Sequence, residues 1–160
     1  MRRINGVIAL ALLLVLGNLT LACATADSSR DHPQTMTLQL TDTEVDSASL
    51  DLGAPGEGIG DQFVATGDLT RHGNPAGGAH LSCPLTRRAG TASTFQCSGV
   101  LALPAGQIAA QGAALLVDDQ PIGFSLAVTG GTGAYRTAHG QLKTVELSST
   151  ERRITVELVL

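Results

Sequence analysis

Length, composition and charge describe a small acidic protein and argue against several functions. The chain has 160 residues, a formal net charge of −4 and only 2% aromatic residues, with no tryptophan. A negative chain without a Lys/Arg cluster argues against a nucleic-acid surface, and so few rings argue against a stacking platform for sugars or single-stranded nucleic acid.

Residues 1–26 have the pattern of a secretory signal peptide. Two arginines form the charged start, a short apolar stretch follows, and small residues allow cleavage after Ala24 or Ala26. The apolar stretch is shorter than the roughly 20 residues of a membrane-spanning helix. We therefore expect an exported or secreted protein, with 27–34 as a polar, flexible tether before a single domain at 35–160.

Cys23 leaves a second outcome open for the N-terminus. The residues before it, Leu19-Thr20-Leu21-Ala22, resemble a lipoprotein processing site, although Thr20 stands where an aliphatic residue is usual. A lipid on Cys23 would make the protein a lipoprotein at a membrane. Without that lipid we expect no membrane partner.

Alternating apolar residues predict eight strands and no helix after the signal peptide. In chain order the strands are expected over residues 36–45, 62–71, 79–86, 94–103, 107–116, 122–129, 140–147 and 153–160. Glycine and proline predict a long loop at 48–59 and a break at Gly73-Asn74-Pro75 and Gly77-Gly78. Short strands at this spacing are typical of an all-β barrel or sandwich.

Cys83 and Cys97 are predicted to form a disulfide across the third and fourth strands. They are the only cysteines after the signal peptide, and an even number is expected in an exported chain. Each lies seven residues from Gly90, so a hairpin centred on Gly90 places them opposite each other. A metal site would need further ligands, and His80 is the only near neighbour, so we expect no metal.

A glycine-rich segment, 130–140, joins the sixth and seventh predicted strands. Its four glycines surround one aromatic residue, Tyr135, and permit a sharp turn in which that ring fills a barrel end. The segment does not match a dinucleotide or phosphate loop, because Tyr135 and Arg136 stand where such motifs need glycine or lysine.

The glycine-rich corner resembles that of the allene oxide cyclase and dirigent superfamily of eight-stranded barrels. Gly60-Asp61-Gln62-Phe63 and Phe95-Gln96-Cys97-Ser98-Gly99 precede it in the expected order, so that 35–160 is similar to the secreted bacterial branch. The resemblance implies an eight-stranded antiparallel β-barrel that acts as a cyclase or isomerase, or like a dirigent protein, without a cofactor. It also implies a homo-oligomer, which is a trimer in relatives.

Four polar residues are the candidate ligand-binding residues, namely Asp42, Arg71, Tyr135 and His139. Asp42 and then Glu44 continue the apolar face of the first predicted strand, and Arg71 continues the apolar face of the second. Tyr135 and His139 have the same parity across the glycine-rich corner. The other interpretation is that all are solvent-exposed strand ends. No catalytic residue is assigned, because the chain has no nucleophile motif.

Two function classes remain for such a barrel. One is a cyclase or isomerase that confines a small hydrophobic molecule in a lumen widened by small residues, with polar groups steadying developing charge. The small residues are Ala65, Gly67, Gly99 and Ala109 or Ala110. The other is a non-catalytic ligand-binding or interaction protein of the cell envelope or exterior, which the low aromatic content favours. An open pocket with polar groups would favour the first class. The pair Arg152-Arg153 is interpreted as a solvated strand end.

Overall fold

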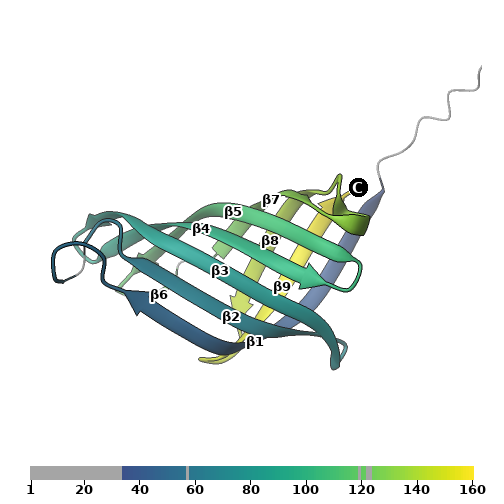
Figure 1. The fold of residues 1–160 in the computed structure, drawn as a ribbon, viewed down its shortest axis with the longest axis horizontal. Coiled ribbons are helices and arrows are strands. Elements are labelled where there is room, and N and C mark those ends of the chain that lie inside the picture. Colours follow the sequence, from purple (N-terminus) through teal and green to yellow (C-terminus); the bar gives the residue numbers. More distant parts are fainter. Residues whose placement is uncertain (1–33, 57, 119, 122–123) are drawn as a thin grey trace, which may run out of the picture. The chain divides into compact units, whose positions relative to one another are not determined.

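The structure, a computed structural model, describes residues 34–160 apart from 57, 119 and 122–123, and these form a closed antiparallel barrel (Figure 1). Its eight long strands are β1 Thr35–Leu50, β2 Gln62–Arg71, β3 Asn74–Ala89, β4 Ala92–Leu103, β5 Gly106–Val117, β7 Phe124–Gly131, β8 His139–Glu146 and β9 Glu151–Val159. A two-residue strand, β6 Gln120–Pro121, pairs with the end of β5. The barrel closes where β1 pairs with β9.

The predicted fold class, an all-β antiparallel eight-stranded barrel, is therefore confirmed. The predicted signal peptide and all of the tether except Gln34 lie outside the described residues. Within the described part of the chain, no helix has the length and apolar character needed to cross a membrane.

The two ends of the barrel differ. One, here called the corner end, holds the start of β1, the end of β9 and η1, a single 3-10 turn at Gly133–Tyr135. The opposite, mouth end holds the loop at 51–61 and the turn between β3 and β4. Because the strands run alternately up and down, each leads from one end to the other.

The corner half of the barrel is packed solid. Inward-facing Ile108, Val156 and Leu158 are at most 2% exposed. Tyr135 is buried in the same hydrophobic cluster, as predicted, at 7% exposure. Gly131 has no room for a side chain, since a Cβ there would lie 2.8 Å from the Cβ of Tyr135. The glycine-rich corner thus brings the aromatic ring against the core.

The disulfide prediction is confirmed. The β3–β4 register aligns Cys83 with Cys97, whose Cα atoms are 4.2 Å apart and whose sulfurs are bonded. The hairpin is tighter than expected, because the strands continue to Ala89 and from Ala92. Only Gly90 and one further residue form the turn, and Gly90 has a left-handed φ of 62°.

The predicted break at Gly77-Gly78 is wrong. β3 begins at Asn74 and runs through both glycines. Gly77 is needed for close approach rather than for a turn, because a Cβ there would overlap the backbone carbonyl of Ala102 on β4. The absence of a side chain at Gly77 lets β3 approach β4 closely at this point.

Candidate functional site

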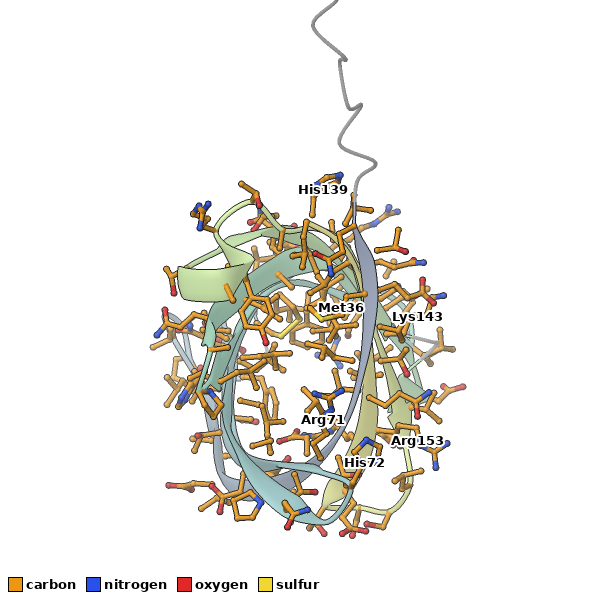
Figure 2. The ribbon with its side chains drawn as sticks, turned by 90° about the vertical axis from the view of Figure 1, so that its right-hand side faces the viewer. Met36, Arg71, His72, His139, Lys143 and Arg153 are labelled. Carbon is orange, nitrogen blue, oxygen red and sulfur yellow. A yellow bond between two sulfur atoms is a disulfide. The ribbon has the colours of Figure 1, made fainter. Side chains whose placement is uncertain are left out.

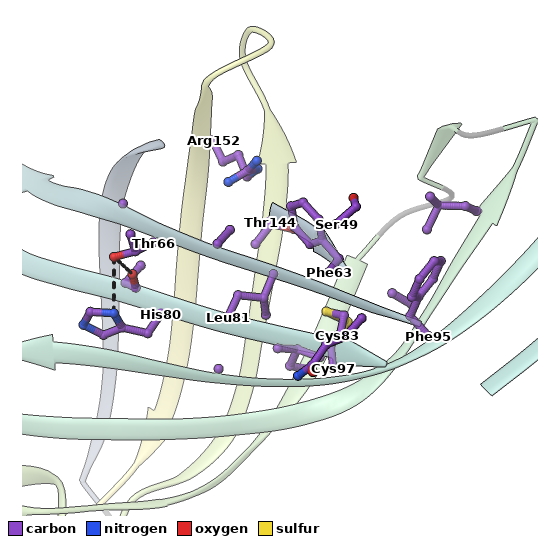
Figure 3. Close-up of a pocket in the computed structure, with 18 of the residues that line it drawn as sticks. Ser49, Phe63, Thr66, His80, Leu81, Cys83, Phe95, Cys97, Thr144 and Arg152 are labelled. Atoms are coloured by element: carbon purple, nitrogen blue, oxygen red, sulfur yellow. Dashed lines mark hydrogen bonds between the residues drawn. A yellow bond between two sulfur atoms is a disulfide. The ribbon is translucent and has the colours of Figure 1, made fainter. Parts of the chain in front are cut away.

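A pocket of about 970 Å³ opens at the mouth end of the barrel (Figure 3). All eight long strands contribute to its lining, which is largely apolar. Its volume lies within the range of small-molecule sites, roughly 300–1,000 Å³. The barrel is therefore solid at one end and hollow at the other.

Small residues contribute to the lining of the hollow, together with large side chains such as Phe63 and Phe95. Ala65, Gly99 and Ala114 line the pocket. Ala65 and Gly99 were among the residues predicted to widen the lumen. The disulfide lies in the same wall, where Phe63 pairs with Cys83 across β2 and β3 (Figure 3).

One buried acid stands out in this apolar wall. Asp42 is 5% exposed and is the only charged residue among the buried residues that the structure describes. Arg152 donates from Nη1 to Oδ2 of Asp42 over 3.3 Å and from Nη2 to Oε2 of Glu44 over 2.5 Å. The second oxygen of Asp42, Oδ1, is buried and has no hydrogen-bond partner within the described residues.

The wall of the barrel is shaped around that carboxyl group. Gly67 on β2 lies so close that a Cβ there would overlap Oδ1 of Asp42. The space expected to widen the lumen at Gly67 is thus occupied by the carboxyl group. Next to it, β1 carries an irregularity between Glu44 and Asp46, and such bulges re-aim side chains.

The surroundings push the two acids in opposite directions. Burial raises the pKa of Asp42 above its ordinary value, and Arg152 only partly opposes this. The hydrogen bonds from Arg152 and Ser47 lower the pKa of Glu44. Asp42 therefore retains its proton to higher pH than an exposed aspartate, beside an ionised Glu44–Arg152 pair. Carboxyl groups whose pKa values are pushed apart in this way are suited to different roles in acid–base chemistry.

The structure separates the four predicted ligand-binding residues. Asp42 lines the pocket, whereas Arg71, Tyr135 and His139 do not. Arg71 and His139 are exposed at the corner end (Figure 2), and Tyr135 is buried there. Only Asp42 is thus in place to meet a molecule bound at the mouth.

Arg152 was misinterpreted as a solvated strand end. Its side chain is 24% exposed, faces the pocket and pairs with two acids, whereas the neighbouring Arg153 is exposed. A signal for this was present, because Arg152 shares its parity with Ile154 and Val156 on the apolar face of β9. Glu146 on β8 pairs in register with Arg152 and also lines the pocket.

Comparisons with known proteins find matches among solved structures. No family model matches the chain, and no curated protein does. A pyocyanin demethylase is 26% identical with a TM-score of 0.68, over 78% of this chain and 100% of that chain. A Diels–Alderase from Streptomyces koyangensis is 11% identical with a TM-score of 0.60, over 81% of this chain and 70% of that one. A pterocarpan synthase dirigent protein is 13% identical with a TM-score of 0.53, over 80% of this chain and 94% of that one.

These neighbours define the class of barrel. Cyclases and dirigent proteins share the closed eight-stranded architecture with this chain. The predicted likeness to the allene oxide cyclase and dirigent superfamily is confirmed at the level of the fold.

Proposed function

We propose that the protein is an enzyme that binds a small, largely apolar molecule at the mouth of the barrel and promotes its cyclisation or isomerisation, with Asp42 as proton donor. One observation carries the proposal. Oδ1 of Asp42 is buried without a hydrogen-bond partner in the described structure, on a residue that lines the pocket. A buried polar atom without a partner costs roughly 1–3 kcal/mol. A polar group of the ligand would supply the missing partner.

The chemistry follows from the surroundings of the acid. A neutral carboxyl at Oδ1 can donate a hydrogen bond, and then a proton, to an oxygen or ring nitrogen on which negative charge develops. Arg152 lies on the other oxygen of Asp42 and stabilises the carboxylate that is left behind. The apolar walls confine a flexible substrate near its reactive conformation and keep water away from the reacting atoms.

A second candidate reaction is demethylation of pyocyanin or a related compound. It is favoured by the 26% identity with the pyocyanin demethylase, whose entire chain is covered. The same pocket and the same acid would serve either reaction. Demethylation balances if one water is consumed, the methyl carbon leaves as formaldehyde and the phenazine ring of the substrate itself takes up the two electrons, with Asp42 supplying a proton to the ring; reoxidation of the ring in air then leaves a product lighter by a methylene.

Mass spectrometry separates the candidates in one experiment. Wild-type protein and the Asp42→Asn variant are incubated with a panel of lipids, terpenoids, polyketide intermediates and pyocyanin. Cyclisation or isomerisation gives a product of unchanged mass and altered retention, whereas demethylation gives one lighter by a methylene. We expect turnover by the wild type and at least about a 100-fold loss in Asp42→Asn, the scale of one positioned acid. Ligand-induced stabilisation without any product would instead support a non-catalytic binding protein.

We also propose that the protein is exported, on the pattern of residues 1–26. N-terminal analysis of protein recovered from the producing cells should find a chain that begins after Ala24 or Ala26, or at a lipid-bearing Cys23. A chain that retains Met1 would contradict export through this signal.

A further inference from the structure

We propose that Gly67 is a positioning residue for Asp42, and that its missing side chain is what allows the carboxyl group, with its buried Oδ1, to pack against β2 in the wall of the pocket. The role of Asp42 as proton donor rests on the proposed function. The placement of its carboxyl group by Gly67 rests on the geometry alone.

The space at Gly67 is already filled. A Cβ on this residue would overlap Oδ1 of Asp42 and would lie 3.0 Å from its Cγ and 2.9 Å from the backbone carbonyl oxygen of Thr43. Cβ atoms essentially never approach other heavy atoms so closely. Any side chain at 67 must therefore displace the carboxyl group or the backbone of β1.

Backbone conformation gives no other reason for a glycine at this position. Gly67 is absent from the glycines with positive φ, and its pairing with Ala79 on β3 is regular, although the irregularity of β1 after Glu44 lies opposite it. An alanine would adopt the same backbone without strain. The requirement is for space, and the carboxyl group of Asp42 is the side chain that uses it.

Displacing the carboxyl group would change its electrostatic surroundings. Arg152 on β9 binds its Oδ2, while Glu44 on the same strand and Asp68 on β2 add negative charge nearby. Glu146 on β8 faces Arg152 across the ladder. An alanine side chain at 67 that displaces the carboxyl group moves it out of the space beside β2, and a position nearer the open pocket reduces the burial that now favours its protonated form.

The test compares Gly67→Ala with Gly99→Ala. Gly99 lines the same pocket, but a Cβ there would meet its nearest atoms at 3.4 Å, the backbone oxygen of His80, and 3.5 Å, in Leu81, which are close to ordinary contacts. The readout is the pH titration of the carbon-13 NMR signal of the Asp42 carboxyl group. That signal is assigned by its absence from the spectrum of Asp42→Asn. It needs no substrate, so the result stands whether or not the protein proves to be a cyclase or a demethylase.

We expect Gly67→Ala to lower the pKa of Asp42 toward the range of an exposed aspartate, and Gly99→Ala to leave it unchanged. An unchanged Asp42 titration in a folded Gly67→Ala variant would overturn the proposal. If Gly67→Ala does not fold, the double variant Asp42→Ala/Gly67→Ala decides. Recovery of folding identifies the carboxyl group as the obstacle, and failure of the double variant to fold overturns the proposal.

Discussion

Replacing Arg152 by methionine should destabilise the barrel by about 2–3 kcal/mol near neutral pH. The guanidinium makes two charge-assisted hydrogen bonds, of 3.3 Å to Asp42 and 2.5 Å to Glu44, with all three side chains at most 24% exposed. Each such bond contributes about 1.5–3 kcal/mol. Their sum is an upper limit, because Asp42 can take up a proton and Glu44 keeps its hydrogen bond from Ser47. Methionine roughly conserves the buried volume, so the loss reflects charge.

Urea unfolding at about pH 7 and about pH 4 measures this loss. The deficit of Arg152→Met should shrink at the lower pH, because protonation of the two acids removes the charge left uncompensated. Arg153→Met is the matched control. That neighbouring side chain is exposed on the outer face, and its replacement should change stability by no more than about 0.5 kcal/mol. Equal losses in the two variants, or a loss in Arg152→Met that does not depend on pH, would refute the role of the ion-paired cluster.

Three further predictions follow from the core, the disulfide and the acids. Tyr135→Ala should cost roughly 3–5 kcal/mol in unfolding experiments, and a loss below about 1 kcal/mol would contradict burial of the ring. Removing the disulfide with Cys83→Ala/Cys97→Ala should cost on the order of 3 kcal/mol, and free thiols at both positions in native protein, seen by non-reducing peptide mapping, would contradict the bond. Burial raises the pKa of Asp42, so the folded state binds its proton more tightly than the unfolded state. Wild-type stability should therefore fall relative to Asp42→Asn as the pH rises above the ordinary aspartate range. Glu44 has a lowered pKa, so its contribution should be lost as the pH falls, and Glu44→Gln should abolish that loss. A chemical-denaturation series across pH measures both slopes, and either slope with the opposite sign would contradict the assigned cause.

The scaffold could be predicted from the sequence because its signals are local. Strand alternation reports which face of a strand is buried, and the spacing about Gly90 was enough to pair Cys83 with Cys97. The parity that Arg152 shares with Ile154 indicates that its side chain faces the barrel interior. This orientation was not predicted because two adjacent arginines beside a turn resemble a solvent-exposed strand end.

The site itself depends on information that parity does not carry. Alternation indicates which face a residue occupies but not which end of the barrel it is near. Asp42 lies in the middle of β1, opposite Leu69, and Arg71 lies two residues beyond Leu69 at the end of β2. Although the two residues are on neighbouring strands, the pocket reaches Asp42 and not Arg71. The fit of Asp42 against Gly67 depends on a cross-strand contact beside the irregularity after Glu44, which no local pattern predicts.

The central claim, that the mouth pocket binds the small molecule on which the protein acts, is tested most directly by ligand-dependent thermal stabilisation in a pair of adjacent variants. Ala114 is buried and lines the pocket, and Ala113 beside it on β5 is exposed on the outer face. A panel compound at 100 times its dissociation constant should stabilise the wild type and Ala113→Leu by about 2.7 kcal/mol. Ala114→Leu, folded but with part of the pocket filled, should lose that stabilisation. Stabilisation that persists in Ala114→Leu and disappears in Ala113→Leu would place the ligand outside the barrel and contradict the account.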